Sequence, residues 1–493
     1  MNFLYRTIVS KSLVFISVLS VSFTGCSKLV TTPAPYTGLS QLNVYATDGS
    51  AIAVMTGLYT NLSYTGPFTG STGISLFSGL SADEFTLFNE VATSDPKYFY
   101  YTNTLYATRQ AGMGSDFWLQ AYSNNGIYTC NASIEGLTGS SLLTPSVKQQ
   151  LLGESYFMRA LFYFYLVNLY GEVPIVTTTN YKVNEQLPRA TTQQVYAQII
   201  SDLKIAQGLL SASYLDGSLT PYGAAPERVR PTKWAADALL ARTYLYTKDY
   251  ADAVLQADSV INNALLYSLD TLNGVFLMNS TEAIWQLQPT NSQHNTEDGW
   301  LFILPPTGPS ASYSPYPVYL SNDLLSTFEL GDQRRTNWVD SVIVNSDTFY
   351  FPYKYKSATL GATLKEYQMV LRLGEQYLIR AEAEANGASG GTAAAIADLN
   401  VIRNRAGLQN YSGATDATSV LNVILHEREV EFFTELGQRW LDLKRTGTVD
   451  AVMTLACPRK NGSSWNSYQQ LYPIYYNDIL SDPNLTQNPG YAF

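Results

Sequence analysis

The stretch 419–445, SVLNVILHEREVEFFTELGQRWLDLKR, constrains the fold more than any other part of this chain. Helical spacing collects its large apolar side chains into one stripe, which predicts a single helix with one face in the core. A charged stripe runs roughly 100° away and flanks the core-facing side. Glu435 lies four residues before Arg439, and Asp442 lies three before Arg445, so carboxylates and guanidinium groups can pair. We interpret the stretch as a scaffold helix stabilised by partly buried ion pairs.

Helical periodicity recurs through the chain and predicts a mainly α-helical fold. Residues 231–247 and 249–263 read as two helices with a short turn and alanines at the contact positions, as in a tetratricopeptide hairpin. Residues 371–384 and 393–405 read as a second pair with a glycine-rich joint. Stacked pairs of this kind make a rigid, curved scaffold. Further helices are predicted at 51–62, 117–137, 146–169 and 191–210.

Two long segments, 63–110 and 265–351, lack helical periodicity and are rich in Gly, Ser, Thr, Asn, Pro and aromatic residues. Short strands are predicted at 283–287 and 340–351. Long irregular segments inside a globular domain are usually functional. We therefore expect these two segments to form a loop-rich ligand-binding lobe inserted into the helical scaffold.

Several motifs resemble those of the SusD/RagB family. The stretch described first carries E-R-x-x-E-F at 427–432 and E-x-G-x-R-W-x-D-L-K-R at 435–445. Residues 159–174 read R-A-x-x-Y-F-x-L-V-x-x-Y-G-x-V-P, and 372–383 read R-L-x-E-x-Y-L-I-R-A-E-A. The closing segment, 472–491, is similar to the last motif of the family. The resemblance extends over nearly the whole chain and implies a SusD-like helical fold with long irregular loops.

The N-terminus predicts export and a lipid anchor. Arg6 and Lys11 precede a short apolar run that is typical of a signal peptide and too short to span a bilayer. The run ends at Gly25-Cys26, which resembles a bacterial lipobox, in which Cys26 becomes the acylated N-terminus. An ordinary signal peptide with an incidental cysteine is the alternative. We expect a lipoprotein signal peptide at 1–25, a flexible Thr/Pro/Gly tether at 26–40 and a single helical domain at 41–493.

Charge and motif content argue against several classes of function. The net charge is −10 and no Lys/Arg cluster occurs, so nucleic acid is not expected as a partner. Two distant histidines and no cysteine cluster argue against a metal site, and His426-Glu427 lacks the second zinc-protease histidine at Val430. No glycine-rich phosphate loop precedes a lysine, and no cofactor is expected. Cys130 and Cys457 could form one disulfide or be two buried thiols.

The family resemblance implies a function. It implies a lipid-anchored outer-membrane protein, displayed at the cell surface, that captures an oligosaccharide. The ligand would then be delivered to a SusC-like TonB-dependent transporter as the partner. A peptide or glycopeptide ligand is the alternative within the family. Outside it, a glycosidase would need two suitably spaced carboxylates, for which Asp83, Glu84 and Glu90 are available; we expect a binding protein and not an enzyme.

Aromatic side chains in two irregular regions, 85–106 and 300–319, are the candidate ligand contacts. Rings with polar tips suit surfaces that are partly apolar and partly hydrogen-bonding, although such rings can equally pack the loops onto the scaffold. Prolines in 300–319 reduce the entropy lost when a loop is held ready for a ligand. Trp300 follows polar residues, whereas Trp285 fits a buried strand. The candidate ligand-binding residues are Asp83, Tyr101, Trp300, Tyr313, Tyr316 and Tyr319.

Overall fold

Helix α8 (Pro145–Tyr170) is enclosed by the rest of the protein along most of its length. Pro145 stands in its first turn, where a missing N–H costs little, and Gly171, with a φ of 76°, follows its last residue. We describe a computed structural model, which covers residues 44–64, 66–107, 113–123, 126–311 and 315–491. From Tyr45 onward the chain forms one compact unit.

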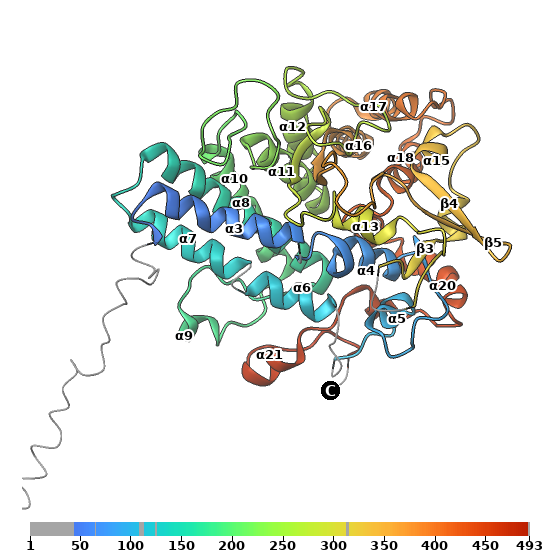
Figure 1. Cartoon of the computed structure of the whole chain (residues 1–493), viewed down its shortest axis with the longest axis horizontal. Helices are drawn as coiled ribbons and strands as arrows, with labels where there is room; N and C mark the ends of the chain where they lie inside the picture. Colours follow the sequence, from blue (N-terminus) through green and yellow to red (C-terminus); the bar gives the residue numbers. More distant parts are fainter. Residues whose placement is uncertain (1–43, 65, 108–112, 124–125, 312–314, 492–493) are drawn as a thin grey trace, which may run out of the picture. The chain divides into compact units, whose positions relative to one another are not determined.

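Helices that follow one another in the chain pack against one another in an array (Figure 1). The fold is mainly helical with a few short strands, as predicted, and half of the residues are helical. Both predicted hairpins are present, and each helix of the array contacts the next. In order, the array comprises α7 (Ile127–Gly139), α8, α10 (Thr192–Leu209), α11 (Lys233–Thr247), α12 (Tyr250–Ile261), α16 (Leu373–Ala385), α17 (Gly391–Arg405) and α18 (Ala417–Phe432).

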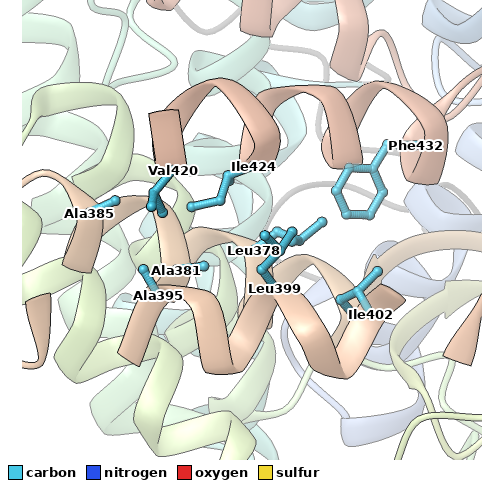
Figure 2. Close-up of a cluster of buried hydrophobic side chains, with 9 residues drawn as sticks. All are labelled: Leu378, Ala381, Ala385, Ala395, Leu399, Ile402, Val420, Ile424 and Phe432. Carbon is cyan, nitrogen blue, oxygen red and sulfur yellow. The ribbon is translucent and has the colours of Figure 1, made fainter. Parts of the chain in front are cut away.

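Small residues allow the second hairpin to pack closely against α18 (Figure 2). Alanines on α16 and α17 face each other, and larger aliphatic side chains fill the space between these helices and α18. A close-packed interior of this kind tolerates little change in volume. The nine buried residues are Leu378, Ala381, Ala385, Ala395, Leu399, Ile402, Val420, Ile424 and Phe432.

The strands of the described residues form three antiparallel pairs. β1 (Phe85–Leu87) pairs with β3 (Val318–Leu320), and β2 (Ala283–Leu287) pairs with β6 (Gln368–Arg372). β4 (Val339–Val344) and β5 (Asp347–Pro352) form a hairpin. The predicted strand 283–287 is therefore confirmed, with Trp285 fully buried, and the region 340–351 is a hairpin.

The remaining helices of the described residues are not part of the array. The N-terminal ones are α3 (Asp48–Tyr64), η2 (Gly70–Thr72), α4 (Ile74–Ser81), α5 (Pro96–Tyr101), α6 (Met113–Tyr122) and α9 (Tyr181–Asn184). The middle ones are α13 (Glu297–Phe302), α14 (Asn322–Leu325) and α15 (Gln333–Asn337). The C-terminal ones are α19 (Gln438–Arg445), α20 (Val449–Ala456), η3 (Cys457–Arg459), η4 (Ser467–Gln470) and α21 (Tyr476–Ser481). No helix of the described ranges is long and apolar enough to cross a membrane.

Two predicted helices are each broken into two. The region 117–137 contains the end of α6 and most of α7. The stretch 419–445 contains α18 and α19, and a connector of residues 433–437 separates them. Thr434, Leu436 and Gly437 all have positive φ values, of 59°, 46° and 72°. The prediction of one continuous helix was wrong because tertiary hydrogen bonds hold this connector: Leu436 N–H donates to Ser75 Oγ at 3.0 Å.

The break changes which charged groups pair. The predicted pair Asp442–Arg445 forms, at 2.7 Å, but Glu435 does not pair with Arg439. Glu435 instead contacts Lys354 at 2.5 Å and Arg372 at 2.8 Å. Most charged side chains of the stripe therefore form ion pairs with other segments of the fold. These pairs support the interpretation of the stretch as part of the scaffold.

Arg439 links α19 to the segment that leads into β1. Its guanidinium donates to both carboxylate oxygens of Asp83, at 2.9 and 2.7 Å, and lies 2.9 Å from Glu429. Burial lowers the pKa of this guanidinium, but the carboxylates outweigh burial and raise it, so the pair stays ionised.

Glu84 binds the α18–α19 connector to the same segment. Its Oε1 accepts a hydrogen bond from Thr434 N–H at 2.8 Å, and its Oε2 is buried without a hydrogen-bond partner among the described residues. Burial raises the pKa of Glu84 to about 8, and the Asp83 charge adds to this effect. At neutral pH the folded protein therefore favours the protonated carboxyl.

Two further local features concern a salt bridge and the cysteines. Asp332 accepts hydrogen bonds from buried Arg334, at 2.8 Å for the closest, and the two form a structural salt bridge. Cys130 and Cys457 are both free thiols and both buried. Cys26 lies outside the described residues.

We expect Arg439→Ala to lower the free energy of unfolding by about 3–5 kcal/mol, because it leaves the buried carboxylate of Asp83 and the half-buried one of Glu429 without their partner. Chemical denaturation measures this loss. Arg459→Ala is the control: its pair with Asp323 is exposed, with side chains 56% and 36% accessible, so its loss should stay below about 1 kcal/mol. Similar small losses for both variants would contradict the role given to Arg439.

We expect the stability of the wild type relative to Glu84→Gln to fall as pH rises. The folded pKa is raised from 4.5 to about 8, so the stabilisation due to Glu84 is fully present below pH 4.5 and is lost as pH passes 8. Glutamine does not ionise and keeps an oxygen for Thr434. Denaturation at pH 5 and pH 9 tests this, with exposed Glu90→Gln as control. If the difference in unfolding free energy between wild type and Glu84→Gln is the same at both pH values, Glu84 is not a buried, protonated carboxyl.

Candidate ligand-binding surface

Strands β1 and β3 bring the two aromatic-rich regions of the sequence together. They pair antiparallel, with Thr86 opposite Tyr319. These two side chains are half-exposed, whereas the other four residues of the strands are buried. A ladder with one face on the core produces this alternation. Thr86 and Tyr319 therefore lie on the solvent-facing side of the ladder.

A hollow of about 240 Å³ opens beside this ladder. Three of the candidate residues, Asp83, Tyr101 and Tyr319, line it together. The structure thus unites side chains that are more than 200 positions apart in the sequence. The other lining residues are Phe85, Thr86, Ser321, Asn322, Asp323, Ala456, Arg459 and Lys460.

The tyrosines supply uncharged hydroxyl groups to the hollow. Tyr101 is 4% exposed, its hydroxyl is hydrogen-bonded to Thr86, and burial raises its pKa to about 12. Burial also raises the pKa of the half-exposed Tyr319. Both phenols therefore stay protonated at neutral pH, so each can donate or accept a hydrogen bond.

Two basic side chains from the C-terminal part of the chain complete the hollow. Lys460 is buried, and its Nζ donates to the carbonyls of Leu80 and Ser81 at 2.7 and 3.1 Å. It lies 5.4 Å from the centre of the Tyr101 ring, and burial lowers its pKa to about 8. Arg459 is exposed and pairs with Asp323 at 2.7 Å. The mouth of the hollow therefore presents both donors and acceptors.

Asp83 has a structural role in this surface. Burial raises its pKa, but Arg439 outweighs burial and lowers it. Both carboxylate oxygens already accept from that guanidinium. Asp83 therefore forms part of the wall, with its hydrogen-bonding capacity largely used within the protein.

Trp300 and Tyr316 form a second group with His294. The imidazole of His294 stacks on the indole of Trp300, with ring centres 4.6 Å apart and planes at 17°. The Tyr316 ring meets the indole edge-to-face at 5.8 Å. Glu297 accepts from Asn291 and lies 2.9 Å from His294 Nδ1, which fixes the imidazole. The predicted pair is therefore in contact, and its rings are half-exposed.

Helix α13 holds Trp300 in place. Thr296 caps the helix by accepting from Gly299 N–H. Asp298 is buried and accepts from Gly70 N–H at 2.7 Å and from Gln368 at 2.8 Å. Burial raises the pKa of Asp298 to about 6. The indole is thus presented from a well-anchored turn.

The loop that follows α13 adopts an unusual backbone at Tyr316. Its φ is 83°, in the left-handed region that bulky residues rarely adopt. Tyr316 N–H donates to Leu301 O, and its carbonyl accepts from Ser310, so both sides of the loop are fixed. Strained residues of this kind concentrate at ligand sites. Tyr313 lies outside the described residues.

The carboxylates considered for a glycosidase are poorly suited to catalysis. Asp83 is paired with Arg439, and Glu84 is 2% exposed and bonded to the backbone of Thr434. In a glycosidase, two carboxyl groups must flank the glycosidic bond that is cleaved. Asp83 and Glu84 are held by other parts of the protein and are not free to do so. Within the described part of the chain, no group of three or more His, Cys, Asp or Glu side chains could hold a metal ion.

Sequence reasoning missed Asp323, Arg459 and Lys460. They line the hollow beside Tyr101 and Tyr319 but come from α14 and from the end of η3. No local pattern distinguishes these charges from ordinary surface residues. Only the fold brings them beside β1 and β3.

Comparisons with known proteins give a consistent result. Residues 82–245 match a family model described as starch-binding associating with outer membrane, and residues 333–491 match the SusD family model. SusD-like protein P2 of Formosa agariphila is 25% identical over 96% of this chain and 98% of its own length.

Solved structures share the fold. A laminarin-binding SusD-like protein has a TM-score of 0.72 at 22% identity, over 90% of this chain and 99% of its own. Surface glycan-binding protein A from Bacteroides uniformis has the same TM-score at 19% identity, with the same two coverages. The first family model describes starch binding, and the protein is a binding protein and not an enzyme, as predicted. The chain belongs to the SusD/RagB family.

Proposed function

We propose that this protein binds an oligosaccharide at the surface of the outer membrane, where a lipid on Cys26 anchors it. It then passes the oligosaccharide to a SusC-like TonB-dependent transporter. The observation that carries the proposal is the hollow in which Tyr101 and Tyr319 meet polar and charged side chains. The family match and the names of the relatives, which include starch-binding and laminarin-binding proteins, support a glycan as the ligand.

The surface has the chemistry that sugars require. A sugar ring has an apolar face of C–H groups and a rim of hydroxyl groups. Aromatic faces pack against the first, and hydroxyl, carboxylate and guanidinium groups bond the second. Tyr101 and Tyr319 supply rings with hydroxyl tips, and Arg459 and Asp323 supply charged groups at the mouth. The platform of Trp300 and Tyr316 supplies a further stacking surface.

A peptide or glycopeptide is the second candidate ligand. An extended peptide would need open backbone hydrogen-bonding groups along a strand or an apolar pocket for an anchor side chain. The hollow instead has mixed polar walls. Affinity gels that contain starch, laminarin, a hemicellulose or a pectin test the proposal, because a glycan ligand retards the protein. No retardation by any polysaccharide, together with binding to a peptide mixture, would favour the second candidate.

We expect Trp300→Ala, Tyr316→Ala and Tyr319→Ala each to weaken binding of the retarding glycan by roughly 1–3 kcal/mol, the range of an aromatic anchor. Isothermal titration measures the loss, and thermal melts confirm folding. Trp285→Phe is the control, because Trp285 is fully buried between Tyr59 and Phe157. It should lower stability and leave affinity unchanged. If the folded Trp300 and Tyr316 variants bind like the wild type, that pair is not part of the site. If the folded Tyr319 variant does so, the hollow is not the site.

We expect Cys26→Ala to move the protein from the membrane fraction to the soluble fraction. The basis is the apolar run that ends at Gly25-Cys26, because lipid attachment requires the thiol. Fractionation of cells that lack the partner transporter measures this directly. A Cys26→Ala variant that stays in the membrane fraction of such cells would rule out the lipid anchor.

A further inference from the structure

A second hollow, of about 220 Å³, is lined by residues of α6 and α21 and by the residues around the end of α9. We call it the acidic hollow, because the carboxylates of Glu185, Asp478 and Asp482 line it and no basic side chain is among its described lining residues. The Asn484 amide donates to the Gln186 carbonyl at 3.0 Å and joins the two segments that carry these carboxylates. The acidic hollow shares no lining residue with the hollow beside β1 and β3.

The hydrogen-bond donors in the wall of the acidic hollow are used within the protein. Trp118 Nε1 donates to Asp478 Oδ2 at 2.7 Å. The Tyr122 hydroxyl, the Asn184 amide and the Ser481 hydroxyl each donate to a backbone carbonyl at 2.8 Å. The hydrogen-bonding capacity that remains in the wall is therefore mostly that of acceptors.

Several acceptors of the wall have no donor. The second carboxylate oxygen of Asp478, Oδ1, has no partner among the described residues. Asn184 Oδ1 is buried and also lacks a partner there. Glu185 is exposed and forms no ion pair within the described part of the chain. A buried acceptor without a donor is unfavourable, so a ligand that supplies donors is stabilised here.

The charges favour a cationic ligand over an uncharged sugar. Burial raises the pKa of Asp478, the hydrogen bond from Trp118 lowers it, and the charge of Asp482 raises it again, with a net increase. A positive group in the hollow would relieve the repulsion between these carboxylates. A sugar hydroxyl brings acceptor lone pairs as well as a donor, whereas ammonium and guanidinium groups only donate.

Exposed apolar side chains on α9 and α21 indicate that the cation belongs to a protein. Tyr181, Val183 and Leu480 are 67%, 48% and 67% exposed. Both helices lie in the lower part of Figure 1. Exposed apolar surface of this kind marks contacts between proteins, and arginine is the charged residue that is enriched at their centres.

We propose that the acidic hollow binds an arginine side chain of a partner protein, whose neighbouring apolar residues cover Tyr181, Val183 and Leu480. The guanidinium group donates to Asp478 Oδ1 and to the carboxylate of Glu185, which carry the charge that it requires. This site is additional to the proposed glycan site and does not depend on it.

Two labelled peptides test the proposal by fluorescence anisotropy with the purified protein. The first is capped Ala-Leu-Arg-Leu-Ala, and in the second citrulline replaces arginine, which keeps the shape and removes the charge. We expect the arginine peptide to bind roughly tenfold more tightly. Asp478→Asn and Glu185→Gln should each weaken its binding by roughly five- to tenfold and leave the citrulline peptide unaffected. Both variants should fold, because asparagine keeps an acceptor for Trp118 and Glu185 is exposed.

Glu172→Gln is the matched control. Glu172 is an exposed carboxylate two residues before Pro174, which lines the acidic hollow, but Glu172 itself does not line it. The variant removes the same charge from the same part of the surface. Its binding of the arginine peptide should match that of the wild type.

Two results would overturn the proposal. One is equal affinity for the two peptides, or folded Asp478→Asn and Glu185→Gln variants that bind the arginine peptide like the wild type. The other is tighter binding of a glucosamine trimer than of the arginine peptide, with the same loss in both variants, which would identify a cationic sugar as the occupant. Neither result affects the proposed function, which the affinity gels test with uncharged and acidic glycans.

Discussion

Three guanidinium groups meet at the buried carboxylate of Glu431. Arg334 lies 2.9 Å and Arg372 2.6 Å from it, and Arg405 contacts it as well. Burial raises the pKa of Glu431, but the three arginines together hold it far below its usual range. Arg334 belongs to α15, Arg372 to the end of β6 and Arg405 to α17. Four separate elements are therefore fixed at one point, where a buried charge without its partners would cost several kcal/mol.

The same kind of pairing extends from the scaffold to the proposed ligand-binding surface. Glu435 holds Lys354 and Arg372 just beyond α18, and Arg439 holds Asp83 just before β1. Glu84, next in the chain, accepts from the backbone of the α18–α19 connector. The position of β1, and through it that of β3 and Tyr319, is therefore set by directional contacts with the helical array. A surface fixed in this way loses little conformational entropy when a ligand binds, as the proposed function requires.

Local periodicity predicted most of the fold. Each helix of the array buries one face, so its apolar residues recur at helical spacing in the sequence. It failed at 433–437, where the stretch still fits a helical pattern. There Gly437 takes a left-handed backbone and Ser75, from a distant helix, satisfies Leu436 N–H. A contact between residues more than 300 positions apart has no local signal.

The arrangement of the proposed ligand-binding surface was predictable only in part, for a related reason. Aromatic and proline content outside any helical pattern identified the regions of Tyr101, Trp300 and Tyr319. Arg459 and Lys460 carry no such signal, since isolated basic residues are ordinary on a surface. Tertiary packing decides which residues lie beside Arg459 and Lys460, and no single stretch of the sequence specifies it.

A crystal structure of the protein with a bound hexasaccharide tests the central claim most directly. The account predicts a sugar unit in the hollow, within hydrogen-bonding distance of Tyr101 or Tyr319. The separate hollow of about 220 Å³ lined by Trp118, Tyr122 and Asp478 is an alternative location. Sugar density there, with none beside Tyr319, would contradict the account.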